Sequence, residues 1–141
     1  MNFGTFISSS GRRAALAALA LFALAGCASL QPATPEEAVS ARAAQRWKAL
    51  IAHDWPAAYE FLTPAFRATM NVERYAYRFV GVPRWLDATA VRSAKCEEDR
   101  CTVVVNIVVD YPTKANTKTL NTDVTETWLR EDGQWYKYEA M

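Results

Sequence analysis

The chain has 141 residues, enough for one domain with a hydrophobic core, and its formal net charge at pH 7 is +1. Its basic residues form no dense block, which argues against a nucleic-acid partner. Hydrophobic residues make up 51% of the chain and tryptophan occurs five times, so we expect it to fold rather than to stay disordered.

The N-terminal segment has the pattern of a secretory signal peptide. Arg12 and Arg13 precede a short apolar run over residues 14–25, and Leu24-Ala25-Gly26-Cys27 closes that run. This closing stretch resembles the lipobox of bacterial lipoproteins. In that family the signal is cut before the cysteine, and the cysteine then carries lipid, with acyl chains such as palmitate. The resemblance implies a signal peptide over residues 1–26, lipid attachment at Cys27 and a lipidated tether over residues 27–33.

Two other interpretations of this segment are weaker. A transmembrane anchor needs roughly 20 apolar residues, and this run is shorter and consists mostly of alanine. The paired arginines resemble a Tat signal, but the Phe-Leu that is usual in that family does not follow them. Ala28 stands after Cys27, where an Asp would retain an enterobacterial lipoprotein at the inner membrane. The resemblance therefore favours the outer membrane, with the domain facing the periplasm.

The first half of the domain carries helix signals. Thr34-Pro35-Glu36-Glu37 has the residues of a capping box, with proline in the first turn. The helix is expected to end near His53, and Arg42 and Arg46 are expected mainly outside its apolar stripe. That stripe consists of Val39, Ala43, Trp47, Leu50 and Ile51.

Three shorter helices are predicted after the first. Asp54, Thr63 and Asn71 can each cap a helix, and a proline follows closely after the first two. The last of these helices is expected to run on to Gly81, because glycine readily adopts the left-handed conformation that ends a helix.

From Trp85 onward the hydrophobic period changes to two, which predicts strands. The clearest strand covers residues 101–111. A strand over residues 120–130 and a last one over residues 135–138 follow, joined by the hairpin signal Asp132-Gly133. Helices followed by an antiparallel meander of about four strands define an α+β domain over residues 34–141.

Cys96 and Cys101 flank a charged turn between two of these strand-like runs. An exported protein meets an oxidising compartment, and this spacing can place the two Cβ atoms opposite each other on a hairpin. A disulfide is therefore predicted. A metal site would lack further ligands, and a redox pair would more usually read Cys-x-x-Cys.

Two stretches resemble the NTF2-like superfamily, which includes SnoaL-like and ketosteroid-isomerase-like proteins. Residues 44–64 combine a long helix, a tight turn before Asp54, and then Tyr59 and Thr63-Pro64. Residues 126–136 match the final hairpin of that family. The resemblance implies a cone in which a curved sheet wraps around helices, often with a pocket at the open end. Members range from isomerases and dehydratases to binding and assembly modules, so the fold does not settle the function.

Glu126 is the main candidate for a functional carboxylate. If the two cysteines oppose each other, Arg92 lies opposite Val105, and the expected pairing of the next strands places Val105 opposite Glu126. The three residues then share one row on one face. There Glu126 lies between apolar neighbours, where a charge must be paired. We expect Glu126 to face the pocket and to pair with Arg92 or with a tyrosine such as Tyr138. Such a pair could anchor the polar end of a ligand, or it could serve only to neutralise the buried charge.

Other candidate groups are expected to be structural. His53, the single histidine, is expected at a helix end, and Asp54 is expected to cap a helix rather than to act as a base. No residue is assigned a catalytic role, and the sequence predicts no metal site and no cofactor. The aromatic residues either line a cavity for an apolar ligand or fill an ordinary core.

These features predict a lipid-anchored cell-envelope protein that acts as a small-molecule-binding or accessory module. One alternative is an isomerase or dehydratase that uses Glu126 as its base on a small apolar substrate. Another is a structural component of an envelope assembly; VirB8-like secretion proteins share the expected fold but use a transmembrane anchor. The expected partners are the membrane through the lipid on Cys27, a second copy through the sheet, and an unknown protein or small apolar ligand.

Overall fold

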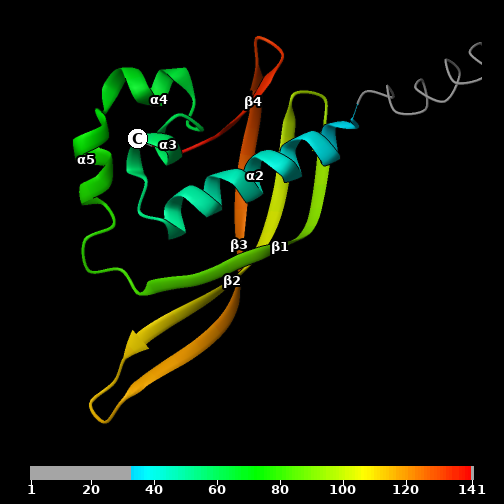
Figure 1. Ribbon diagram of the computed structural model, residues 1–141. Coiled ribbons are helices and arrows are strands. Elements are labelled where there is room, and N and C mark those ends of the chain that lie inside the picture. The colour runs from blue at the N-terminus through cyan, green and yellow to red at the C-terminus, as the bar shows by residue number, and fades with distance from the viewer. Residues whose placement is uncertain (1–32, 141) are drawn as a thin grey trace, which may run out of the picture. The chain divides into compact units, whose positions relative to one another are not determined.

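The computed structural model describes residues 33–140, so the predicted signal peptide and Cys27 lie outside the described part of the chain. Four helices come first along this part, and a four-stranded sheet follows (Figure 1). The helices are α2 (Pro35–Ile51), α3 (Trp55–Tyr59), α4 (Pro64–Thr69) and α5 (Val72–Tyr77). The strands are β1 (Arg84–Glu97), β2 (Arg100–Pro112), β3 (Thr117–Glu131) and β4 (Gln134–Lys137).

The helices begin where their capping residues predict. At the start of α2, the Glu37 amide donates to Thr34 Oγ1 (3.2 Å) and the Thr34 amide donates to Glu37 Oε2 (2.9 Å), which completes the predicted capping box. Asp54, Thr63 and Asn71 cap α3, α4 and α5 in the same way, each accepting from the amide three residues further on. Asp54 is thus a helix cap, as predicted.

Two residues with a left-handed backbone separate these helices from their neighbours. His53 has a φ of 55° in the tight turn after α2, a conformation that histidine tolerates better than bulkier residues. Gly81 has a φ of 79°, although α5 already ends at Tyr77 and so is shorter than predicted. The stretch between α5 and β1 is therefore an irregular connection.

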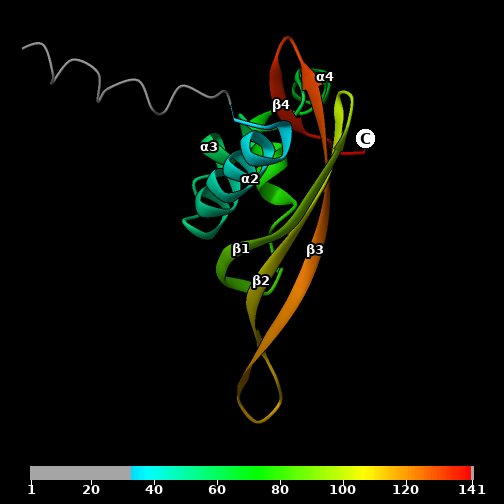
Figure 2. The same cartoon turned by 90° about the vertical axis from the view of Figure 1, so that its right-hand side faces the viewer.

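The four strands form one antiparallel sheet in the order β1-β2-β3-β4, and the helices lie on its concave side (Figures 1 and 2). Strand β2 alternates between buried and less buried positions, with Val103, Val105, Ile107 and Val109 on the helix side. These residues pack with the buried side of α2 in a single core. The predicted α+β architecture is confirmed.

The two long strand pairs differ in regularity. The pairing of β2 with β3 runs without a register shift from Arg100–Leu129 to Pro112–Thr117. The pairing of β1 with β2 has three register shifts, one of them between Val91 and Ser93. Such shifts mark bulges, which displace every side chain that lies beyond them.

The predicted disulfide joins Cys96 to Cys101 across the hairpin between β1 and β2. The two cysteines are paired directly in the strand register, and Cys101 is fully buried. Because the loop that the disulfide closes is short, its stabilisation is about 2 kcal/mol by loop entropy. It fixes the end of the sheet against which the start of α2 packs.

Candidate functional site

Glu126 lies in the core on the helix side of β3, with only 3% of its surface exposed. Its Oε1 accepts from Arg46 Nη1 at 2.6 Å, and its Oε2 accepts from Trp128 Nε1 at 3.0 Å. Arg46 is also 3% exposed, and Trp128 is completely buried. A buried carboxylate is thus held by one cation and one indole N–H, which is how proteins keep such a charge in an apolar core.

Arg46 was not predicted as a partner of Glu126, because its charge was taken to place it outside the apolar stripe of α2. The structure shows that this expectation was wrong. Arg46 follows Ala43 by three residues and precedes Leu50 by four, so it projects from the same side of the helix. The helical spacing was the signal that could have found it.

The predicted partners of Glu126 were also wrong. Val105 pairs with Val91 and Val124, and Glu126 lies opposite Val103 instead. Arg92 falls in the register shift between Val91 and Ser93, and its Nε bonds the Asp123 carboxylate at 3.0 Å on the exposed side. Tyr138 is 44% exposed. The predicted row of Arg92, Val105 and Glu126 does not form. A bulge in β1 displaces Arg92, and the pairing of β2 with β3 differs by two residues from the predicted pairing.

Further charged groups continue from Arg46 toward the surface. Arg46 Nη2 lies 3.8 Å from Glu139 Oε1 and donates to the Tyr75 hydroxyl at 3.5 Å. Glu139 also pairs with Lys137 (2.5 Å) and Arg78 (3.7 Å). Helices α2 and α5, strands β3 and β4 and the C-terminal residues are thereby linked by one charge network.

Burial shifts the titration of two members of this network. Burial lowers the pKa of Lys137 below its ordinary value, and the neighbouring Glu139 carboxylate opposes that shift. Burial raises the pKa of Tyr75 above its ordinary value, and the nearby Arg46 charge opposes that shift. Neither group lines any of four surface hollows in the described domain.

The surroundings of Glu126 leave little room for acid–base chemistry. A general base must lie within hydrogen-bond distance of the proton that it takes from a substrate. Here both carboxylate oxygens already accept bonds from the protein, and the side chain is buried. Glu126 lines none of four surface hollows of the described domain, whose walls are formed by other residues.

The interior of the cone is filled by aromatic rings in contact with one another. Trp47 packs edge-on against Trp85, and Phe79 packs edge-on against both Trp85 and Tyr75. Trp55 stacks on Phe79 with the ring centres 5.0 Å apart. Of the two expectations for the aromatic residues, the structure supports an ordinary core.

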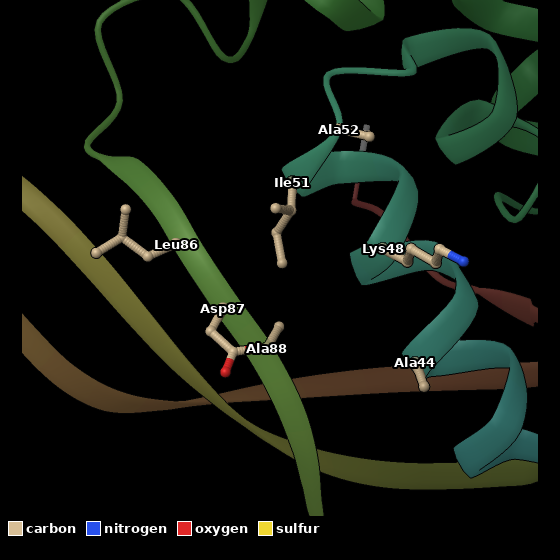
Figure 3. A pocket seen from close by; sticks show the side chains of 7 residues that line it. All are labelled: Ala44, Lys48, Ile51, Ala52, Leu86, Asp87 and Ala88. Atoms are coloured by element: carbon tan, nitrogen blue, oxygen red, sulfur yellow. The ribbon is translucent and has the colours of Figure 1, made fainter.

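A groove of about 500 Å³ lies between α2 and the first half of β1 (Figure 3). Its walls are mostly apolar, and Ile51 points from α2 into the gap toward β1, whereas the Lys48 ammonium points away from β1 (Figure 3). The lining residues are Ala44, Lys48, Ile51, Ala52, Leu86, Asp87 and Ala88. The groove is open to solvent and separate from Glu126.

Among residues 33–140, no group of three or more His, Cys, Asp and Glu side chains is placed to hold a metal ion. Nor does the described part of the chain contain a helix that is long and apolar enough to cross a membrane.

Comparison with known proteins shows the fold. No family model matches the chain, and no curated protein matches it. The CaMKII hub of S. rosetta is similar, with a TM-score of 0.52 and 17% identity over 77% of this chain and 95% of the hub. A SEC-C motif containing protein from Rhodopseudomonas palustris has a TM-score of 0.53 and 16% identity over 67% of this chain and 70% of that one.

A third similar structure, of a Mycobacterium tuberculosis protein of unknown function, has a TM-score of 0.49 and 20% identity over 71% of this chain and 66% of that one. The hub has the NTF2-like fold, so the predicted NTF2-like cone is confirmed for this chain. At these identities the similarity shows the fold alone.

We predict strong energetic coupling between Arg46 and Glu126. Arg46→Met or Glu126→Gln should each lower the free energy of unfolding by about 3 kcal/mol, because each leaves a buried charge without its partner. The double variant should lose less than the sum, by at least about 1 kcal/mol. Urea unfolding of the four proteins measures this cycle, and strictly additive losses would contradict the assignment.

We also predict that Tyr75 makes the fold sensitive to alkaline pH. Because the pKa of Tyr75 is raised in the folded state, the unfolded chain releases this proton first, so stability falls as the pH rises above about 10. Tyr75→Phe cannot ionise and should lose less stability than wild type between about pH 9 and about pH 11. Urea unfolding at both pH values tests this. Tyr77→Phe, which removes an exposed phenol, is the matched control, and equal losses for wild type and Tyr75→Phe would contradict the prediction.

Proposed function

We propose that this protein is a lipid-anchored component of a bacterial cell envelope whose domain binds another protein and does not turn over a substrate. The observation that carries this proposal is the state of Glu126, which is buried and bonded on both oxygens in the interior where a catalytic carboxylate would have to meet its substrate. Because the interior is closed, we infer that the functional surface lies on the outside of the domain.

The outside of the domain carries several exposed large apolar side chains. Most of them lie on α5, on the connection to β1, at the start of β1 and on the first half of β3. We name this set of residues the apolar end. It consists of Tyr77 and Val80 (75% exposed each), Val82 (41%), Leu86 (40%) and Leu120 (48%). Large apolar side chains left in water are the residues that a partner protein would cover.

The chemistry around the apolar end indicates the kind of partner. Arg74, Arg78 and Arg84 flank it and are all exposed. Leu86 also lines the groove of Figure 3, so an apolar side chain of the partner could enter there. A protein segment with apolar residues between acidic ones complements this surface.

The path of the chain favours a protein over the anchoring membrane as the partner that binds the apolar end. The residues that follow the predicted tether enter the domain at the start of α2, whereas the groove lies along the last turns of that helix. A helix of this length spans about 25 Å. A domain held from its N-terminus can therefore present the apolar end to a partner away from its attachment point.

The anchoring part of the proposal rests on Leu24-Ala25-Gly26-Cys27 and the apolar run before it. Two or three acyl chains on one cysteine hold a protein far more firmly than one chain. The outer membrane is the proposed location because Ala28 follows Cys27.

Site-specific crosslinking in intact bacteria tests this proposal. A photoreactive residue at Val80 should give discrete protein adducts in the membrane fraction, whereas the same residue at Lys95, exposed at the far end of β1, should not. With Cys27→Ser the protein should leave the membrane fraction. Retention of Cys27→Ser in membranes would refute lipid anchoring. Adducts to lipid only, or equal protein adducts at both positions, would refute the protein-binding role.

A further inference from the structure

Strand β3 leaves more than half of one edge without a strand partner. On that side β3 pairs with β4 only from Trp128 to Glu131. Residues 117–123 of β3 are all exposed. In both Figure 1 and Figure 2, no other segment of the described domain lies beside the lower half of β3 on the side away from β2.

The main-chain groups on this edge can be assigned from the bonds further along the strand. The Thr127 carbonyl accepts from the Tyr138 amide, so Thr127 directs its main-chain groups away from β2. Alternate residues of a strand share this direction. Thr119, Asn121, Asp123 and Thr125 therefore present their N–H and C=O groups along the open edge.

This edge lacks most of the features that usually prevent one sheet from pairing with another. Natural edge strands are protected by bulges, proline, charged side chains or a covering element, and of these the open part of β3 carries only two charged residues, Lys118 and Asp123. The opposite edge of this sheet has such protection, because β1 contains three register shifts and packs under α2. Strand β3 has a continuous register with β2 and no proline from Thr117 to Glu131.

We propose that the open edge of β3 binds the same edge of a second copy of this chain, as an antiparallel pair with its twofold axis at Thr122. This register places Leu120 opposite Val124 of the second copy and Asn121 opposite Asp123, so an apolar pair and an amide–carboxylate pair form twice. Moving the axis to Asp123 would set two like charges opposite each other. The eight-stranded sheet that results closes the open edge of both copies.

This dimer goes beyond the proposed anchoring and protein binding, and it can be tested without the lipid. In the full chain carrying Cys27→Ser, the native cysteines are joined to each other, so an added cysteine is the free thiol of the domain. Thr122→Cys should form a disulfide between two copies on mild oxidation, because residues at the axis lie about 4.5 Å apart between Cα atoms. Thr119→Cys should not, since its two copies lie about 20 Å apart.

A second variant tests the main-chain bonds. Asn121→Pro removes an outward N–H and leaves the bonds of β3 to β2 in place, so the fold should survive while dimerisation weakens at least about tenfold. Val104→Lys, at a half-buried position on the face of β2 away from the helices, should leave the dimer intact. Sedimentation measures both variants. Absence of the Thr122 crosslink, equal crosslinking at Thr119, or a dimer that Val104→Lys disrupts and Asn121→Pro does not, would overturn the proposal.

Discussion

The ion pair between Arg46 and Glu126 is the interaction on which the arrangement of this domain depends. It joins the middle of α2 to β3 across 80 residues of sequence, with both side chains almost completely buried. A buried pair of this kind is stable only when both partners are present, because either charge alone would be left in the core without compensation. The pair therefore favours the relative position of helix and sheet that brings the two charges together, and Ala43, Leu50 and Trp128 belong to the apolar core of the domain.

This pair also explains why the fold does not determine the function here. Cones of this kind can hold a pocket, but in this chain Arg46, Tyr75 and the contacting aromatic rings occupy the interior. The surfaces that we propose for binding are therefore external: the apolar end, the groove beside β1 and the open edge of β3. Solved structures with the same fold at 16–17% identity carry no information about these surfaces.

Features that depend on neighbours in the sequence could be predicted, and features that depend on the sheet register could not. The caps Thr34, Asp54 and Thr63 were predictable because each bonds an amide three residues away. The disulfide was predictable because a short hairpin leaves few alternatives. The neighbours of Glu126 were not, because the shift beside Arg92 has no local sequence signal and moves side chains to the opposite face. Glu126 was correctly expected among apolar neighbours and in need of a partner, but it was expected to face a pocket, and its partner Arg46 was not predicted because a charged residue on a helix was assumed to face water.

Hydrogen exchange of the Trp128 indole N–H, followed by NMR, is the most direct measurement of whether the interior is closed around Glu126. This N–H donates to Glu126 Oε2 in a completely buried ring, so it should exchange only when the whole domain unfolds, with a protection that matches the global stability. Exchange at the rate of an exposed indole would show that water reaches Glu126 in the folded state, and it would contradict a closed interior.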